Sequence, residues 1–234
     1  MSRIRTFSPS NLTTHRMQTQ TCEITAARIL AAFNQLRLGG HGNAVETMPG
    51  QLDVNRPLSM EGIRQARAIG KEQEGEHFDL VATSPAIRAQ ETAKFAAGRV
   101  YNVGTIESLG INVEDQTNPL TIMFNELNYA SLGTYFAHQF GDELKAWAMR
   151  VLTEIVEMAE RAKPSGHAKV FIVGHAVCHP AIAWTIGDIF KEGVSSGSAF
   201  LLRKHMLDMH LGEAEVISLV FGHTALNDFY IITP

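Results

Sequence analysis

The sequence predicts an α/β protein built as a three-layer α/β/α sandwich around a mostly parallel central sheet. Strand-like segments alternate with helical segments along the chain, which is the pattern of parallel sheets covered on both faces. Residues 169–174 form a near-continuous apolar run, typical of a strand buried on both faces. The composition, 45% hydrophobic and 19% charged, is that of an ordinary globular protein.

Helical signals occur in segments that are spread along the whole chain. The predicted helices are 23–34, 60–71, 85–97, 142–162 and 179–189. Ser59 is a suitable N-cap for the second helix, and Ser84 with Pro85 is a suitable N-cap and first residue for the third. The fourth keeps apolar residues at helical spacing from Leu144 to Ala162.

Strand signals fall between these helices. The predicted strands are 35–39, 78–83, 169–174, 198–203 and 216–221, with 229–232 as a further candidate. Between 100 and 135 the periodic signals are weak, so we expect irregular structure there. We expect one domain over 21–234 with an insert at about 100–140.

Bulk properties limit the classes of partner. The net charge of −4 argues against nucleic acid, which needs a basic face, and no apolar run is long enough to span a membrane. Two cysteines far apart and the absence of a signal-like apolar region favour a cytoplasmic protein. Residues 1–20 contain Arg, Ser and Thr but no acid, which is typical of a flexible tail and also of a mitochondrial presequence. Nothing in the sequence indicates an oligomeric state.

Polar residues follow three of the predicted strands. In parallel sheets ligands bind beyond the carboxyl ends of the strands, where His41, Arg88 and His175 are expected to meet. A neutral imidazole is a nucleophile near pH 7, and a guanidinium forks around phosphate oxygens. The residues beside them, namely Gly42, Asn43 and Ser84, are expected to contact the same anion. A single buried histidine is more often structural, but two at equivalent strand ends favour a phosphate site.

Four motifs in order resemble the histidine phosphatase superfamily, which also contains the cofactor-dependent phosphoglycerate mutases. They are Leu-Gly-Gly-His-Gly-Asn-Ala at 38–44, Pro-Leu-Ser-Met-Glu-Gly-Ile-Arg-Gln-Ala at 57–66, Ser-Pro followed by Arg-Ala-Gln-Glu-Thr-Ala within 84–93, and Phe-Ile-Val-Gly-His-Ala at 171–176. The resemblance extends from about residue 36 to 179, and more weakly to about 223. It implies a phosphoglycerate mutase-like fold that uses no metal and no cofactor.

The resemblance also implies a role for each site residue. His41 would accept the phosphoryl group as phosphohistidine, while His175 and Arg88 would hold its oxygens. The stretch 124–129 is similar to the mutases' Asn-Glu-Arg-His-Tyr, which makes Glu126 the candidate proton donor. Glu46 and Glu107 are weaker candidates for that donor.

The sequence departs from the family at Gly40, where an arginine normally precedes the nucleophile and binds phosphate. Losing such a charge-assisted contact costs roughly 1.5–3 kcal/mol. The resemblance therefore implies a weakened phosphatase acting on a small phosphorylated substrate, a site rescued by another cation, or a pseudoenzyme that binds phosphate. A phosphoglycerate mutase-type phosphotransferase is a further alternative.

Two rival enzyme classes rest on single motifs. Residues 193–197 match Gly-x-Ser-x-Gly, but the serine elbow needs a strand before it and a helix after it, and the predicted order is the reverse. His175 and His179 have the spacing of zinc ligands on a helix, with Cys178 beside them. The glutamate of a His-Glu-x-x-His motif is missing, so we expect no metal site there.

Overall fold

The computed structural model of the protein describes residues 23–97, 103–128, 130–192, 196–209, 212–222 and 229–232. The predicted tail, Cys22 and the serine of the Gly-x-Ser-x-Gly match lie outside these residues. Within the described part of the chain, no helix combines the length and the apolar character needed to cross a membrane.

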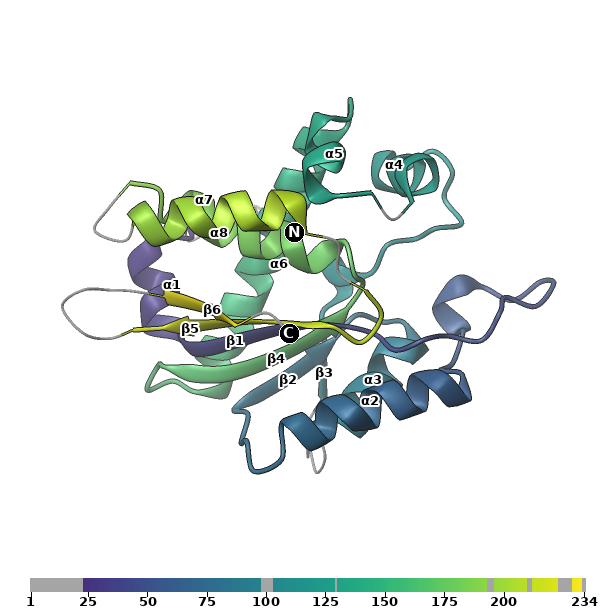
Figure 1. Cartoon of the computed structure of the whole chain (residues 1–234), viewed down its shortest axis with the longest axis horizontal. Coiled ribbons are helices and arrows are strands. Elements are labelled where there is room, and N and C mark those ends of the chain that lie inside the picture. Colours follow the sequence, from purple (N-terminus) through teal and green to yellow (C-terminus); the bar gives the residue numbers. More distant parts are fainter. Residues whose placement is uncertain are drawn as a thin grey trace, which may run out of the picture.

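A six-stranded sheet forms the centre of the molecule, in the order β3-β2-β4-β1-β5-β6 (Figure 1). The strands are β1 (Phe33–Gly40), β2 (Leu80–Thr83), β3 (Val103–Thr105), β4 (Ala168–Gly174), β5 (Val216–Phe221) and β6 (Phe229–Ile232). Strands β1 to β4 run parallel to one another, whereas β5 is antiparallel to both β1 and β6. The mostly parallel sheet predicted from the sequence is confirmed.

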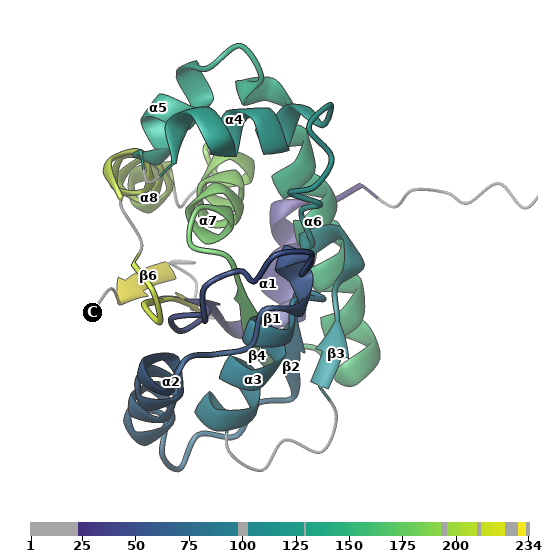
Figure 2. The same cartoon turned by 90° about the vertical axis from the view of Figure 1, so that its right-hand side faces the viewer.

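Helices cover both faces of this sheet, so the three-layer prediction is also confirmed. They are α1 (Ala26–Ala32), α2 (Met60–Glu72), α3 (Ile87–Ala96), α4 (Pro119–Leu127), α5 (Leu132–Ala137), α6 (Gly141–Ala162), α7 (Cys178–Ile189) and α8 (Ser196–Asp208), with short 3₁₀ turns at Asp53–Asn55 and Glu107–Leu109. Figure 2 shows α2 and α3 on one side of the sheet and α6, α7 and α8 on the other. Helices α4 and α5 extend beyond this second layer.

The first helix is shorter than predicted. It ends at Ala32 because Phe33 already pairs with Ala168 as the first residue of β1. Phe33, Leu36 and Leu38 are fully buried in that strand, so sheet pairing and burial outweigh the helical spacing upstream. The prediction for α2 is correct, and Ser59 caps it by accepting the Gly62 N–H at 3.1 Å.

The predicted N-cap at Ser84 is wrong. The Ser84 N–H donates to the Val173 carbonyl at 2.9 Å, so Ser84 continues the pairing of β2 with β4. Helix α3 then begins at Ile87, after Ala86, which lacks a capping side chain. The anion-binding N–H groups of this helix therefore lie two residues further along than predicted.

The strand predicted at 198–203 is also wrong, because these residues belong to α8. Ala199, Leu202 and Met206 are its buried positions, and their spacing of three and four residues is helical. The region expected to be irregular contains two helices as well. Asn118 and Ser131 cap α4 and α5 with their side chains, and caps of this kind start short helices that lack a long periodic pattern.

Candidate active site

Three side chains meet at the carboxyl ends of β1, β2 and β4, which are neighbours in the sheet. His41 follows β1, His175 follows β4, and Arg88 lies in the first turn of α3 after β2. The ring centroids of the two histidines are 5.1 Å apart, and the rings are nearly perpendicular at 86°. The Arg88 Nε–H donates to His41 Nε2 at 3.0 Å. The convergence expected from the strand ends is therefore present in the structure.

The His41 loop is seated against α2 by glycine contacts. An added Cβ on Gly42 would lie 2.6 Å from the Gly62 carbonyl oxygen. One on Gly62 would lie 2.0 Å from the carbonyl oxygen of Asn43. Only hydrogen fits at either position, so these glycines fix the loop that carries His41. The His41 N–H donates to the Gly174 carbonyl at 2.9 Å, which ties the loop to the end of β4.

The hydrogen bonds of His41 define which nitrogen is available for chemistry. Nδ1 lies 2.8 Å from the Gly42 carbonyl, an acceptor, so Nδ1 carries the proton and Nε2 keeps its lone pair. Burial lowers the pKa of His41 to about 4, the positive charge of Arg88 adds to this, and the Gly42 carbonyl opposes it. Burial and the neighbouring His41 also hold the pKa of His175 well below its ordinary value. Both rings are neutral at pH 7.

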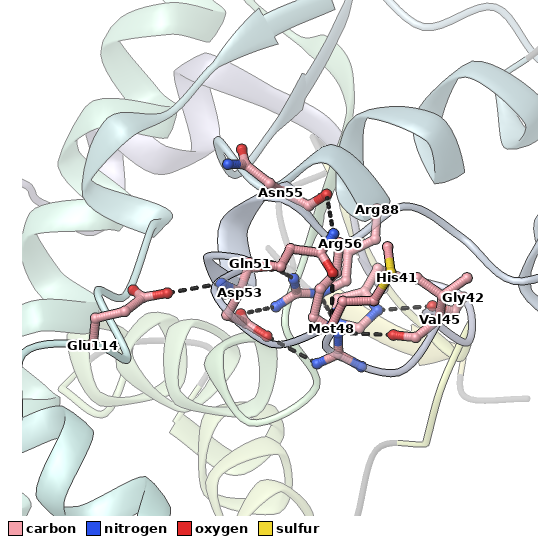
Figure 3. Close-up of polar contacts among 10 residues, drawn as sticks. All are labelled: His41, Gly42, Val45, Met48, Gln51, Asp53, Asn55, Arg56, Arg88 and Glu114. Atoms are coloured by element: carbon pink, nitrogen blue, oxygen red, sulfur yellow. Dashed lines mark hydrogen bonds and ion pairs between the residues drawn. The ribbon is translucent and has the colours of Figure 1, made fainter.

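A loop residue, Asp53, covers Arg88 (Figure 3). Arg88 donates from Nη1 to the Asp53 carbonyl and from Nη2 to the Asp53 Oδ2, each at 2.6 Å. Arg56 donates from Nη1 to Asp53 Oδ1 at 2.8 Å and from Nε to the Val45 carbonyl at 2.9 Å. Burial raises the pKa of the Asp53 carboxyl, but the bonds and charges of Arg56 and Arg88 outweigh it and lower that pKa.

Sequence reasoning did not single out Asp53 or Arg56. Neither residue ends a strand, and both belong to the loop that connects β1 with α2. The signal that was available is the run Asp-x-x-Arg directly before Pro57 and Leu58, with which the second motif begins.

The predicted neighbours of the anion have other partners. The Gly42 N–H donates to Thr92 Oγ1 at 3.0 Å. Asn43 donates its amide to Glu213 at 3.0 Å and accepts the Ser59 hydroxyl at 2.6 Å. Ser84 is fully buried, and its hydroxyl has no hydrogen-bond partner in the described part of the chain. Gly42 and Asn43 therefore support the loop that carries His41, whereas the Ser84 hydroxyl remains without a partner among the described residues.

The structure does not bring Glu126 to the histidines. Its side chain is 55% exposed and bonds to His138 at 2.9 Å. Glu107 instead lines a cavity of about 420 Å³ together with Arg88 and His175. Glu114 lines the same cavity and accepts the Asp53 N–H at 2.7 Å. Glu46 is exposed and does not line this cavity.

The space beside Gly40 is filled by backbone. The Gly40 N–H donates to the Glu215 carbonyl at 2.9 Å, and an added Cβ would lie 3.0 Å from the Gly212 carbonyl oxygen. A side chain at position 40 would therefore push against the segment that enters β5. Glycine at position 40, where the family has arginine, leaves room for the close approach of this segment.

His179 and Cys178 are both buried at the start of α7. His179 is fully buried in α7, and burial lowers its pKa to about 3, while the nearby Gly39 carbonyl opposes the shift. Burial likewise raises the pKa of the Cys178 thiol. Among the described residues, no cluster of three or more His, Cys, Asp or Glu side chains is arranged to hold a metal ion.

Comparison with solved structures shows the same fold. The chain is similar to a phosphoserine phosphatase mutant from Entamoeba histolytica in complex with phosphoserine, at 19% identity over 85% of this chain and 95% of that one, with a TM-score of 0.56. It is also similar to a mycobacterial glucosyl-3-phosphoglycerate phosphatase at 16% identity, over 86% and 97% of the two chains, with a TM-score of 0.55. Bacillus stearothermophilus YhfR is 20% identical over 85% and 95%, with a TM-score of 0.53.

Comparison with curated proteins finds no match. The family model that matches is the histidine phosphatase superfamily (branch 1), over residues 40–197. This match covers more than half of the 234 residues and includes both histidines and Arg88. The chain belongs to the histidine phosphatase superfamily, branch 1.

Proposed function

We propose that the protein is a phosphomonoester hydrolase that works through a phosphohistidine formed on His41. The observation that carries this proposal is the state of the His41 ring. Its Nδ1 is held by the Gly42 carbonyl at 2.8 Å, so the lone pair on Nε2 points toward the Arg88 guanidinium. A neutral imidazole whose reactive nitrogen faces a cation is suited to attack an anionic phosphoryl group.

In the first step His41 Nε2 attacks phosphorus in line with the ester oxygen. The P–N bond forms and the P–O bond to the leaving alcohol breaks, while the alcohol oxygen takes a proton from a carboxylic acid. The Arg88 guanidinium leaves His41 Nε2 and binds the equatorial oxygens. His175, 5.1 Å away between ring centroids, contacts the same oxygens. Phosphoryl transfer needs mainly such positioning and charge stabilisation.

In the second step water releases the phosphate. The carboxylate formed in the first step takes a proton from water, the water oxygen attacks phosphorus, and the P–N bond breaks. His41 recovers its Nε2 lone pair, and inorganic phosphate leaves. These two steps need no metal and no cofactor.

We assign the carboxylic acid to Glu107 in preference to Glu126. Glu107 lines the cavity that also exposes Arg88 and His175, whereas Glu126 is paired with His138 elsewhere. The 3₁₀ turn that carries Glu107 is fixed from behind, because Trp147 Nε1 donates to the Ser108 carbonyl at 2.8 Å. A donor on a fixed turn at the cavity wall meets the geometric need of general acid catalysis.

The same cavity accepts the leaving group of a small substrate. Leu52, Val54 and Ile111 provide apolar wall, and Glu114 provides negative charge. Such a wall favours a neutral or cationic leaving group over an anionic one. We therefore propose a small phosphate ester whose alcohol carries no negative charge.

The test is direct detection of the phosphoenzyme. The wild type is mixed with a ³²P-labelled phosphomonoester and quenched in alkali, which preserves phosphohistidine. We expect acid-labile label on the protein that disappears in His41→Ala. His77→Ala is the matched control, because this exposed histidine lies before β2, at the opposite end of that strand from Arg88.

The alternatives give different results in the same experiment. Phosphate binding without label or turnover identifies a pseudoenzyme, and transfer of label to a glycerate acceptor instead of water identifies a mutase. Undiminished turnover by His41→Ala would end the proposal.

A further inference from the structure

Two arginines hold one carboxylate at the candidate active site. Arg56 Nη1 lies 2.8 Å from Asp53 Oδ1, and Arg88 Nη2 lies 2.6 Å from Asp53 Oδ2. The Asp53 carboxylate therefore bridges two guanidinium groups, as Figure 3 shows. A point where one oxyanion meets two guanidiniums is also a point where a phosphoryl group can bind to both.

This point adjoins the proposed nucleophile. The same Arg88 side chain that bonds to Asp53 donates its Nε–H to His41 Nε2 at 3.0 Å. A phosphoryl group that took the place of the carboxylate would thus sit beside the attacking nitrogen. Arg88 is 5% exposed and Arg56 is 25% exposed at its side chain, so Arg88 forms the floor of the site and Arg56 its rim.

We propose that Arg56 is the second phosphate-binding cation of this site, in the role that Gly40 leaves vacant, and that the Asp53 carboxylate occupies the phosphate position until substrate displaces it. This inference rests on the proposed function, because it names a further residue of the same site. The arginine that is missing at position 40 is then replaced, because a guanidinium reaches the site from the loop instead of from the strand.

The surroundings of both arginines favour this exchange. The backbone of 212–215 closes the space beside Gly40, so the strand cannot supply a cation. Arg56 is aimed by its bond to the Val45 carbonyl, which remains when the carboxylate leaves. Asp53 is held independently at its backbone, since its N–H bonds to Glu114 at 2.7 Å and its carbonyl accepts from Arg88 at 2.6 Å. Rotation of the Asp53 side chain is enough to free the position between the two guanidiniums.

Charge favours the incoming group over the resident one. A phosphate dianion carries twice the charge of the carboxylate and has more oxygens to share between two guanidiniums. While no substrate is bound, Asp53 pairs with the buried Arg88 and the half-buried Arg56, so neither cation lacks a counter-charge. The carboxylate is an internal competitor whose removal should strengthen phosphate binding.

Binding of inorganic phosphate, measured by isothermal titration calorimetry, tests the proposal without requiring turnover. Losing one charge-assisted contact weakens binding roughly 10- to 100-fold, and we expect this for Arg56→Gln. Arg64→Gln is the matched control, because Arg64 is an exposed arginine of α2 paired with Glu61, and its affinity should equal that of the wild type. Asp53→Asn should bind phosphate more tightly than the wild type.

Each outcome decides the question. Equal phosphate affinity of Arg56→Gln and Arg64→Gln overturns the proposal, and so does weaker binding by Asp53→Asn, which would make Asp53 a support for Arg88. If Arg56→Gln does not fold, as judged by circular dichroism, Arg56→Lys and Asp53→Asn carry the test. Loss of phosphate binding in Arg56→Gln without any His41-dependent turnover in the wild type rejects the proposed function and keeps the two-arginine site. His41-dependent turnover in the wild type with unchanged phosphate binding in Arg56→Gln rejects the two-arginine site and keeps the proposed function.

Discussion

Arg88 donates its Nε–H to Nε2 of His41 across 3.0 Å, and this bond combines two functions in one contact. It orients the ring, together with the Gly42 carbonyl on the opposite nitrogen. It also places the permanent positive charge of Arg88 beside the imidazole, which makes protonation of the ring unfavourable. Burial, and after it the charge of Arg88, therefore keeps the proposed nucleophile neutral.

The protonation of His41 should occur far below the usual pH. Because burial and Arg88 lower its pKa to about 4, we expect the ring to remain neutral down to that pH. Long-range ¹H–¹⁵N correlation spectra of the imidazole nitrogens during a pH titration measure this directly. Arg88→Gln removes the charge and should move the midpoint upward, toward 6.5, while burial holds it below that value. A midpoint near 6.5 in the wild type would contradict the prediction.

The buried His179 should make the protein acid-sensitive. Its pKa is about 3 in the folded state and 6.5 in the unfolded chain, so below pH 6.5 the unfolded state binds the extra proton. The free energy of unfolding should therefore fall as the pH drops from 6.5 toward 3, by at most about 1.4 kcal/mol per pH unit for this ring. Urea unfolding at a series of pH values measures the slope.

His179→Leu is the variant that isolates this ring. It removes the titrating group. The fall in the free energy of unfolding between pH 6.5 and 3 should therefore become smaller by the contribution of one histidine. The remaining slope belongs to the other groups whose pKa values are lowered, among them His41, His175 and the Asp53 carboxyl. An unchanged slope in His179→Leu would show that the ring does not titrate on unfolding.

The glycine contact under the His41 loop should be sensitive to one methyl group. Alanine in place of glycine within a helix usually stabilises it by roughly 0.5–1 kcal/mol. At Gly62 the added Cβ would lie 2.0 Å from the Asn43 carbonyl oxygen, so we expect a loss of roughly 1–3 kcal/mol instead. Gly197→Ala in α8 is the control, because no atom lies within 4 Å of its added Cβ. Chemical denaturation of both variants provides the comparison, and equal stability would contradict the packing argument.

The sequence allowed the sheet and the meeting of three side chains to be predicted, because both depend on local signals. A strand buried on both faces leaves a continuous apolar run and a long helix leaves a periodic pattern, as β4 and α6 do. His41 and His175 stand directly after a strand, and Arg88 stands in the first turn of the helix that follows one, so the general rule for parallel sheets brings them together. The prediction failed at 198–203, where a short apolar run does not distinguish a strand from a buried helix face.

The remaining part of the site depends on contacts that the sequence does not encode locally. Asp53 and Arg56 reach Arg88 because the loop folds back across α3, and no periodic pattern marks that path. Glu126 lies in a stretch that resembles a mutase motif, yet the cap at Asn118 and the pairing with His138 direct it elsewhere. Partners supplied by tertiary structure decided the positions of these side chains.

Glu107 and Glu126 form a matched pair of variants for the proton donor. Removing a general acid costs roughly 10²- to 10⁴-fold in rate when the leaving alcohol is a poor one. We expect this loss in the rate of phosphoenzyme formation for Glu107→Gln with an alkyl phosphate, and only a small loss in that rate with a nitrophenyl phosphate, whose leaving group needs no proton. Glu126→Gln should retain the wild-type kcat with both substrates. The opposite result for the two variants would return the donor to Glu126.

The charge of the cavity should appear in the choice of substrate. Phosphoethanolamine and phosphoglycolate are similar in size, but the first has a cationic leaving group and the second an anionic one. Each exposed charge pair contributes roughly 0.2–1 kcal/mol, so attraction of the cation and repulsion of the anion by Glu114 together predict a preference of about 2- to 30-fold in kcat/KM for phosphoethanolamine. Glu114→Gln should lower that ratio and leave kcat/KM for a neutral aryl phosphate unchanged, which separates an effect on charge from an effect on folding. A ratio that favours phosphoglycolate would mean that the leaving group binds outside this cavity, because the Glu114 carboxylate at its wall repels a second carboxylate.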